Sequence, residues 1–317
     1  MAIFVALRSP ELEVLGLTIH VRQRAHPSRH AQRAALHLLE TVGRTDVPVA
    51  EGSHVTIKNF PAPVTKPVSQ SAAAFLVEQA TLHPGQVTVV ALGPLTNIAQ
   101  ALELDPSFAK KIRQIVILGG AYSVNGNVNP AAESNIFGDP DAADTVFTCG
   151  ADILAVGINI TQQVIFSDAD REKLEQSDSK YARHLCKILR HYFDYHRDVY
   201  LRKDADREKL EQCDSKYARY LCKIMGIYFD YHKDAYFIKG VYLHDPTTLI
   251  AAVNPSLLTY TEGVVRVQTV GITRGLTVFD NTKKRYAEVT PWTDKPIVKV
   301  AVTVDAPAVV ELMMQSA

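Results

Sequence analysis

Residues 115–140 read IVILGGAYSVNGNVNPAAESNIFGDP, an apolar run followed by two glycines and a long polar loop. In open α/β sheets, ligands bind at the carboxyl ends of the strands, where a buried strand opens into such a loop. The loop carries four Asn and one Glu, and their amide and carboxylate groups together donate to and accept from sugar hydroxyls. An ordinary connection between a strand and a helix has a similar composition. The stretch predicts an α/β fold and leaves both readings of the loop open.

Apolar strands alternate with helical segments along the rest of the chain. This alternation predicts a single α/β domain, residues 1–317, with a central, mostly parallel sheet flanked by helices. Strands are expected at residues 12–19, 87–92, 114–118, 153–158, 264–270 and 297–304. Helices are expected at residues 29–41, 71–82, 96–104, 141–148 and 307–314.

Composition narrows the possible partners and the location. The 34 Lys and Arg residues equal the 34 Asp and Glu residues, which argues against nucleic acid as a partner. No stretch approaches the roughly 18 apolar residues of a membrane span, and Arg8 and Glu11 come too early for a signal-peptide core. We therefore expect no membrane partner and an intracellular protein. The four cysteines form no CxxC pair, so neither a zinc site nor a disulfide framework is indicated.

A tandem repeat occupies the middle of the chain. Residues 168–203 and 204–239 align without a gap and share 27 of 36 residues. Each copy has helical apolar spacing, and two copies are too few for a helical solenoid, which needs about three. We interpret the repeat as a duplicated helical segment inside the domain. The first copy keeps its spacing to the preceding strand, and the second copy keeps its spacing to residues 244–246. We predict that the second copy lies over the site, because it continues directly into residues 241–245.

Four stretches together resemble one enzyme family. They are the loop at 119–140, ALGPLTN at 91–97, VYLHDP at 241–246 and the C-terminal segment 298–308. In order and spacing they are similar to the inosine-uridine-preferring nucleoside hydrolases, above all to their plant uridine and purine nucleosidases. The resemblance implies a Rossmann-related fold and hydrolysis of uridine- or inosine-type nucleosides to free base and ribose. It also implies bound Ca²⁺, a cytoplasmic location and a homo-oligomer.

The resemblance assigns chemical roles to residues at two strand ends. It implies that the Thr96 carbonyl and the Asp245 carboxylate are metal ligands, and hard oxygen ligands suit Ca²⁺. It implies that His244 is the general acid, a role that fits a side chain whose unperturbed pKa lies near neutrality. Without the resemblance, His-Asp-Pro at 244–246 reads more simply as the start of a helix.

The resemblance also implies the residues that would bind substrate. Asn127, Glu133 and Asn135 correspond to residues that bind the ribose hydroxyls. Tyr228 and His232, in the second repeat copy, correspond to a helix that covers the nucleobase. Helical spacing in that copy fits packing in the core equally well, so both readings of Tyr228 and His232 stay open.

The chain also departs from the family pattern. The Asp-rich motif that supplies most of the calcium ligands is not in the sequence, and residues 1–7 resemble the helix that follows that motif. Residues 19–26 replace a Gly-Asn turn, and a flexible loop is missing before the Pro-rich residues 60–67. Because the number of charged ligands sets calcium affinity, these departures predict weak metal binding and poor catalysis.

Three alternatives follow from these departures. The chain could be a non-catalytic nucleoside-binding protein, a subunit that partners an intact paralogue, or the product of a misassembled coding sequence. A nucleotide-dependent oxidoreductase is disfavoured, because no G-x-G-x-x-G follows the first strand. Sequencing the 5′ end of the transcript distinguishes the misassembled sequence from the others.

Overall fold

The computed structural model describes residues 1–20, 35–36, 38–40, 42–52, 68–167, 169–170, 173, 176, 241–282 and 288–315. Apart from four residues at its start, the repeat lies outside this part of the chain, and so do Tyr228 and His232. Most of the helix expected at residues 29–41 also lies outside it. In the described part, no helix is long and apolar enough to cross a membrane.

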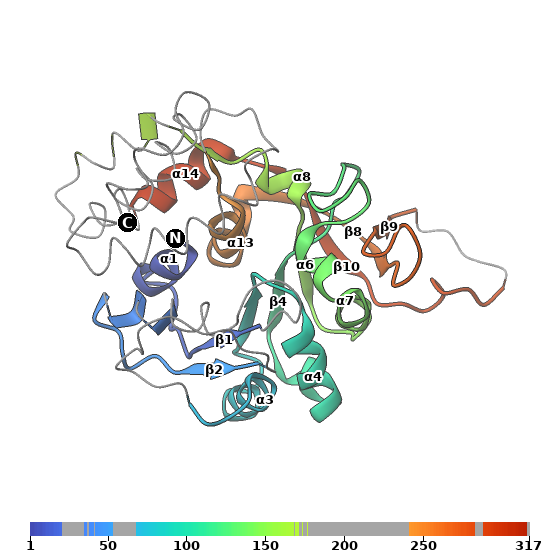
Figure 1. Cartoon of the computed structure of the whole chain (residues 1–317), viewed down its shortest axis with the longest axis horizontal. Helices are drawn as coiled ribbons and strands as arrows, with labels where there is room; N and C mark the ends of the chain where they lie inside the picture. Colours follow the sequence, from blue (N-terminus) through green and yellow to red (C-terminus); the bar gives the residue numbers. More distant parts are fainter. Residues whose placement is uncertain are drawn as a thin grey trace, which may run out of the picture.

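A six-stranded mixed sheet forms the centre of the domain (Figure 1). Its strands follow the order β3-β4-β5-β10-β8-β9. They span Thr88–Ala91, Gln114–Leu118, Ile153–Val156, Val298–Val304, Leu258–Val267 and Thr277–Asp280 in that order. β3, β4, β5 and β10 are mutually parallel, whereas β8 pairs antiparallel with both β10 and β9. The predicted α/β fold is confirmed, with an antiparallel half that the alternation of elements did not reveal.

The parallel half of the sheet aligns three strand ends. Ala91 of β3 is in register with Ile117 of β4, and Ile117 is in register with Ala155 of β5. β4 and β5 are buried almost throughout, whereas β3 at the sheet edge is half-buried or exposed. The loops that follow these strands therefore leave from one edge of the sheet, as expected for a ligand site in an α/β fold.

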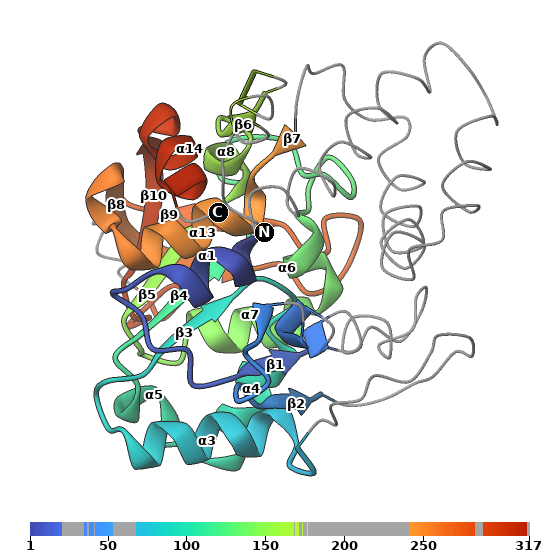
Figure 2. The ribbon, with the colours of Figure 1, turned by 90° about the vertical axis from the view of Figure 1, so that its left-hand side faces the viewer.

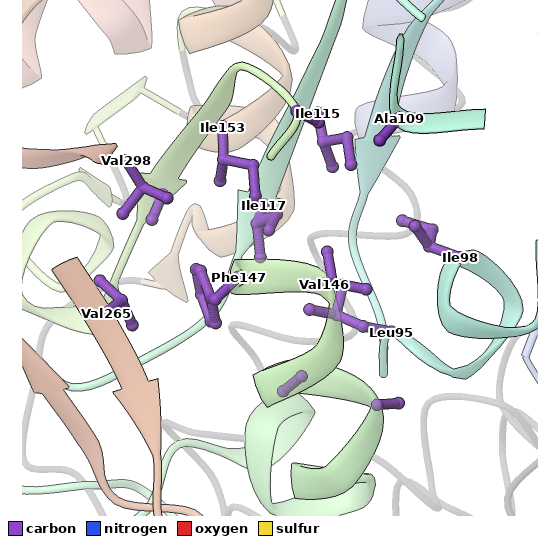
Figure 3. Packing of buried hydrophobic residues seen from close by; sticks show 14 of the residues in the cluster. Leu95, Ile98, Ala109, Ile115, Ile117, Val146, Phe147, Ile153, Val265 and Val298 are labelled. Carbon is purple, nitrogen blue, oxygen red and sulfur yellow. The ribbon is translucent and has the colours of Figure 1, made fainter. Parts of the chain in front are cut away.

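Helices cover both faces of the sheet (Figures 1 and 2). One face carries α3 (Ala72–Leu82), α4 (Thr96–Leu104), α5 (Phe108–Lys111) and α7 (Pro140–Phe147), and their side chains share a core with the central strands. Figure 3 shows Phe147 of α7 beside Ile117 and Ile153 in that core. The other face carries α1 (Ala2–Arg8), α13 (His244–Val253) and α14 (Ala306–Gln315), which share a second core. The loops at the carboxyl ends of the strands are therefore supported by a sheet that is packed on both faces.

Two small sheets flank the central one. β1 (Leu17–Ile19) pairs in parallel with β2 (Val49–Glu51). β6 (Ile165–Phe166) pairs antiparallel with β7 (Val241–Tyr242), and Leu243 N donates to Val164 O at 2.9 Å. The two ends of the segment between β6 and β7 are therefore adjacent in space.

We expect deletion of residues 168–203 to leave the fold intact. The deletion about halves the segment between β6 and β7, and halving a loop changes its closure free energy by only about 0.6 kcal/mol. Thermal melts followed by circular dichroism measure the effect. Phe166→Ala is the positive control, because this side chain is fully buried and truncation of a core Phe costs about 3–5 kcal/mol. A cooperative loss of folding on deletion would contradict the interpretation of the first copy as an addition.

Candidate active site

The polar loop after β4 folds around the carboxylate of Glu133. Glu133 is 2% exposed and caps α6 (Ser134–Gly138). Its Oε1 accepts from Asn135 N at 2.9 Å and Ser134 Oγ at 3.0 Å, and its Oε2 accepts from Ile136 N at 3.1 Å and Gly120 N at 3.3 Å. Burial raises the pKa of Glu133, while these four donors favour its ionised form. The carboxylate therefore holds both ends of the loop together.

Two asparagines of the loop have complementary amide groups left for other partners. Asn127 Oδ1 accepts from Ser134 N at 2.9 Å. Asn135 Nδ2 donates to Leu118 O at 3.0 Å and to Leu92 O at 3.3 Å, which ties the carboxyl ends of β4 and β3 together. An amide has both donor and acceptor atoms, so Asn127 keeps its NH₂ group and Asn135 keeps its oxygen for other partners. The pair can offer one donor and one acceptor to neighbouring hydroxyls.

Asp139 joins this loop to Thr96. Thr96 Oγ1 donates to Asp139 Oδ2 at 2.6 Å, and Asp139 Oδ1 accepts from Ala142 N at 3.1 Å to cap α7. A Cβ on Gly138 would lie 2.7 Å from the Pro94 ring, so glycine allows the α6–α7 junction to approach the loop before α4. Asp139 was not among the predicted site residues, although Asp-Pro at a helix start is a readable capping signal.

His244 begins α13 and is held by a threonine from another element. Its Nδ1 lies 2.6 Å from Oγ1 of Thr161, which is fully buried in α8 (Ile158–Thr161). The ring of Tyr242 lies 5.5 Å from the imidazole, centroid to centroid. α8 is tied to the loop after β4, because Ile158 N donates to Gly120 O at 2.9 Å. Through Gly120 and Thr161, His244 is therefore connected to the loop that contains Glu133.

Asp245 lies beside the amino end of the chain. Its residue surface is exposed, yet the surrounding protein desolvates the carboxyl group and raises its pKa, while the Met1 ammonium lowers it. Burial lowers the pKa of that ammonium, and Asp245 raises it. The two groups are close because α1 packs against α13. Asp245 is therefore next to a positive charge of the protein itself.

Among the residues that the structure describes, the predicted ligands do not complete a calcium site. Ca²⁺ takes six to eight oxygen ligands, whereas the family resemblance implies only two here, the Thr96 carbonyl and the Asp245 carboxylate. Across the ranges that the structure describes, no three His, Cys, Asp or Glu side chains gather in a way that could hold a metal ion. The two predicted ligands have the right chemistry for calcium but are too few to hold the ion.

Comparisons with known proteins identify the family of this chain. A sequence profile of the inosine-uridine preferring nucleoside hydrolase family matches residues 1–205 and 199–311, and the two matches overlap at the junction of the repeat copies. The chain is 54% identical to probable uridine nucleosidase 2 of Arabidopsis thaliana, over 99% of this chain and 92% of that protein. It is 42% identical to uridine nucleosidase 1 of the same plant, over 98% and 87% of the two chains.

A solved structure shows the same fold. The plant nucleoside hydrolase PpNRh1 superposes with a TM-score of 0.77 at 45% identity, over 99% of this chain and 93% of that one. Proteins of this family generally bind a metal ion. Because the family profile spans almost the whole chain and full-length relatives share about half of its residues, the chain belongs to the inosine-uridine preferring nucleoside hydrolases, which hydrolyse the N-glycosidic bond of nucleosides.

Proposed function

We propose that this chain binds uridine- or inosine-type nucleosides with the ribose on the loop after β4. The observation that carries the proposal is the pair Asn127 and Asn135, which presents one donor and one acceptor above the joined ends of β3 and β4. Vicinal hydroxyls of a ribose need such a pair. Glu133 orders the backbone between the two amides and brings its negative charge close to the sugar. The relatives named as uridine nucleosidases favour uridine as the substrate.

The proposed reaction breaks the bond between ribose and base. Positive charge develops on the ribose as the bond breaks, and a buried carboxylate close to it stabilises that charge. His244 is the general acid, which protonates the departing base. Tyr228 and His232 are proposed to contact the base; both lie outside the described residues. We propose Ca²⁺ as the metal ion, with the Thr96 carbonyl and Asp245 as the ligands that this chain contributes.

One observation favours a second function, nucleoside binding without hydrolysis. Thr96 and Asp245 supply only two of the oxygen ligands that calcium requires. The loop after β4, by contrast, is ordered by the hydrogen bonds of Glu133 and Asn127. A chain that binds ribose but holds metal weakly would act as a binding protein or as the partner of an intact paralogue.

Calorimetric titration with uridine, alongside chromatography of released uracil, tests both functions. We expect Asn135→Ala to weaken uridine binding by about tenfold or more, because the variant loses a sugar contact and leaves the Leu92 and Leu118 carbonyls without their donor. Asn254→Ala is the matched control, since Asn254 lies at the far end of α13. Binding without uracil release supports the second function. Absence of uridine binding by the unsubstituted chain refutes both.

Two further expectations come from the family resemblance. They are a homo-oligomeric state and a cytoplasmic location. Sedimentation velocity of the purified chain and fractionation of cells test them respectively.

A further inference from the structure

We infer that Thr161 is a positioning residue that fixes the ring orientation and the tautomer of His244. The inference rests on the function proposed above, in which His244 faces the departing base. Thr161 belongs to none of the stretches that carry the family resemblance, and its hydroxyl lies 2.6 Å from His244 Nδ1.

The hydroxyl of Thr161 is buried and requires an acceptor. Its side chain is 0% exposed, and a buried hydroxyl without an acceptor costs about 1–3 kcal/mol. In the part of the chain that the structure describes, the acceptor offered to it is His244 Nδ1 at 2.6 Å. When the imidazole is neutral, the hydroxyl therefore donates to Nδ1.

The tautomer follows from this hydrogen bond. A neutral imidazole carries one proton, and the partner of one ring nitrogen decides which nitrogen bears it. Donation from Thr161 to Nδ1 places the proton on Nε2. A hydroxyl also accepts hydrogen bonds, so Thr161 can keep its contact with Nδ1 when that nitrogen is protonated. The acid form is the imidazolium, protonated on both nitrogens. It gives its Nε2 proton to the base and is left as neutral imidazole protonated on Nδ1, which donates to the Thr161 hydroxyl.

The position of Thr161 links this orientation to the sugar. α8 is fastened at Ile158 N to Gly120 O, and Gly120 N in turn donates to Glu133. Thr161 lies three residues further along the same short helix. The same backbone thus orients the imidazole and orders the ribose loop. The groups that bind the sugar and the group that protonates the base are therefore held at fixed positions relative to each other.

Nitrogen-15 spectra of labelled histidine test the tautomer directly, at a pH where the imidazole is neutral. The chain has 11 His, so the His244 signals are assigned by their loss in His244→Gln. We expect the Nε2–H tautomer alone in the unsubstituted chain and in Thr161→Ser. Thr161→Val, which is nearly isosteric, is expected to give a mixture of the two tautomers. Thermal melts verify that each variant is folded.

Thr247→Val is the matched control. Thr247 is also fully buried, and its hydroxyl donates to Leu243 O on the same helix as His244. It should leave the His244 spectrum unchanged. A single Nε2–H tautomer in Thr161→Val overturns the inference, as does the same mixture in Thr247→Val.

The kinetic consequence separates this inference from the proposed function. In uracil release we expect Thr161→Val to lower kcat by about tenfold with KM almost unchanged, by analogy with the partners that orient metal-binding histidines, whose loss typically costs 10–100-fold. Thr161→Ser should restore kcat. If uridine is neither bound nor hydrolysed, the proposed function fails while the tautomer result still decides the role of Thr161. A normal kcat in Thr161→Val, in a chain that releases uracil, also refutes the positioning role.

Discussion

An upstream strand bearing the family's Asp-rich motif, joined to Met1 together with the Gly-Asn turn and the missing loop, is expected to raise uracil or hypoxanthine release by about 100-fold or more. Metal activation of water and electrostatic stabilisation of the ribose charge are each worth several kcal/mol of barrier, and 2.7 kcal/mol is already about 100-fold. Within residues 1–317 the ligands proposed for the metal are Thr96 and Asp245, which are too few for Ca²⁺, so we expect poor hydrolysis by this chain.

The structure makes the attachment point favourable for this restoration. The Met1 ammonium lies close enough to Asp245 for each group to shift the pKa of the other. Carboxylates placed just before residue 1 would therefore start beside Asp245. The geometry of α1 and α13 thus suits a metal site completed from the amino end.

Base release is measured for the original and the restored chains, with and without a chelator. In the restored chain, Asp245→Ala should abolish metal binding, because it removes a charged ligand. His244→Ala should spare metal binding and slow the departure of the base, so the two variants separate the two roles. Rapid, chelator-sensitive release by the original chain would show that its own residues suffice, and that the Asp-rich motif is dispensable.

Sequence patterns located β4 most directly. The apolar run in β4 marks a strand buried along nearly its whole length, and the structure has it at the predicted residues, Gln114–Leu118. β8 begins at Leu258 rather than at residue 264, because its first half mixes polar and apolar residues on a partly exposed strand. Periodicity reads burial and therefore misses strands that are defined by antiparallel partners. The mixed character of the sheet has the same origin.

For the candidate site too, the sequence indicated some residues and missed others. Motifs pointed to Thr96, Asn127, Glu133, Asn135, His244 and Asp245, and the structure connects Asn135 to the ends of two strands and His244 to α8. Thr161 and Asp139 carried no such signal as site residues. Their importance depends on partners more than 40 residues away in sequence, and local patterns do not report such distant contacts. Only the folded chain reveals these connections.

Glu133→Ala is expected to lower the free energy of unfolding by about 3 kcal/mol or more. The substitution removes an acceptor of four hydrogen bonds and leaves the amides of Gly120, Asn135 and Ile136 buried or half-buried without it. Each buried donor left unpaired costs about 1–3 kcal/mol, and partial access to water reduces the sum. Urea unfolding followed by circular dichroism measures the loss, with Glu78→Ala, at an exposed position of α3, as the control.

Glu133→Gln isolates the contribution of the charge, because it preserves the shape of the side chain and removes its negative charge. Three of the four partners of the carboxylate are backbone N–H groups, which only donate, so the amide NH₂ of Gln would face at least one of them without an acceptor, while the Ser134 hydroxyl could turn to accept. We expect Gln to lose about half as much stability as Ala, since an unmade buried bond costs about 1–3 kcal/mol. Uridine binding should weaken in both variants, because Asn127 and Asn135 are placed by the loop that Glu133 holds. Full stability and full uridine binding in Glu133→Gln would mean that the negative charge has no part in ordering the ribose loop, and Glu133 would then be a packing residue rather than the anchor of the site.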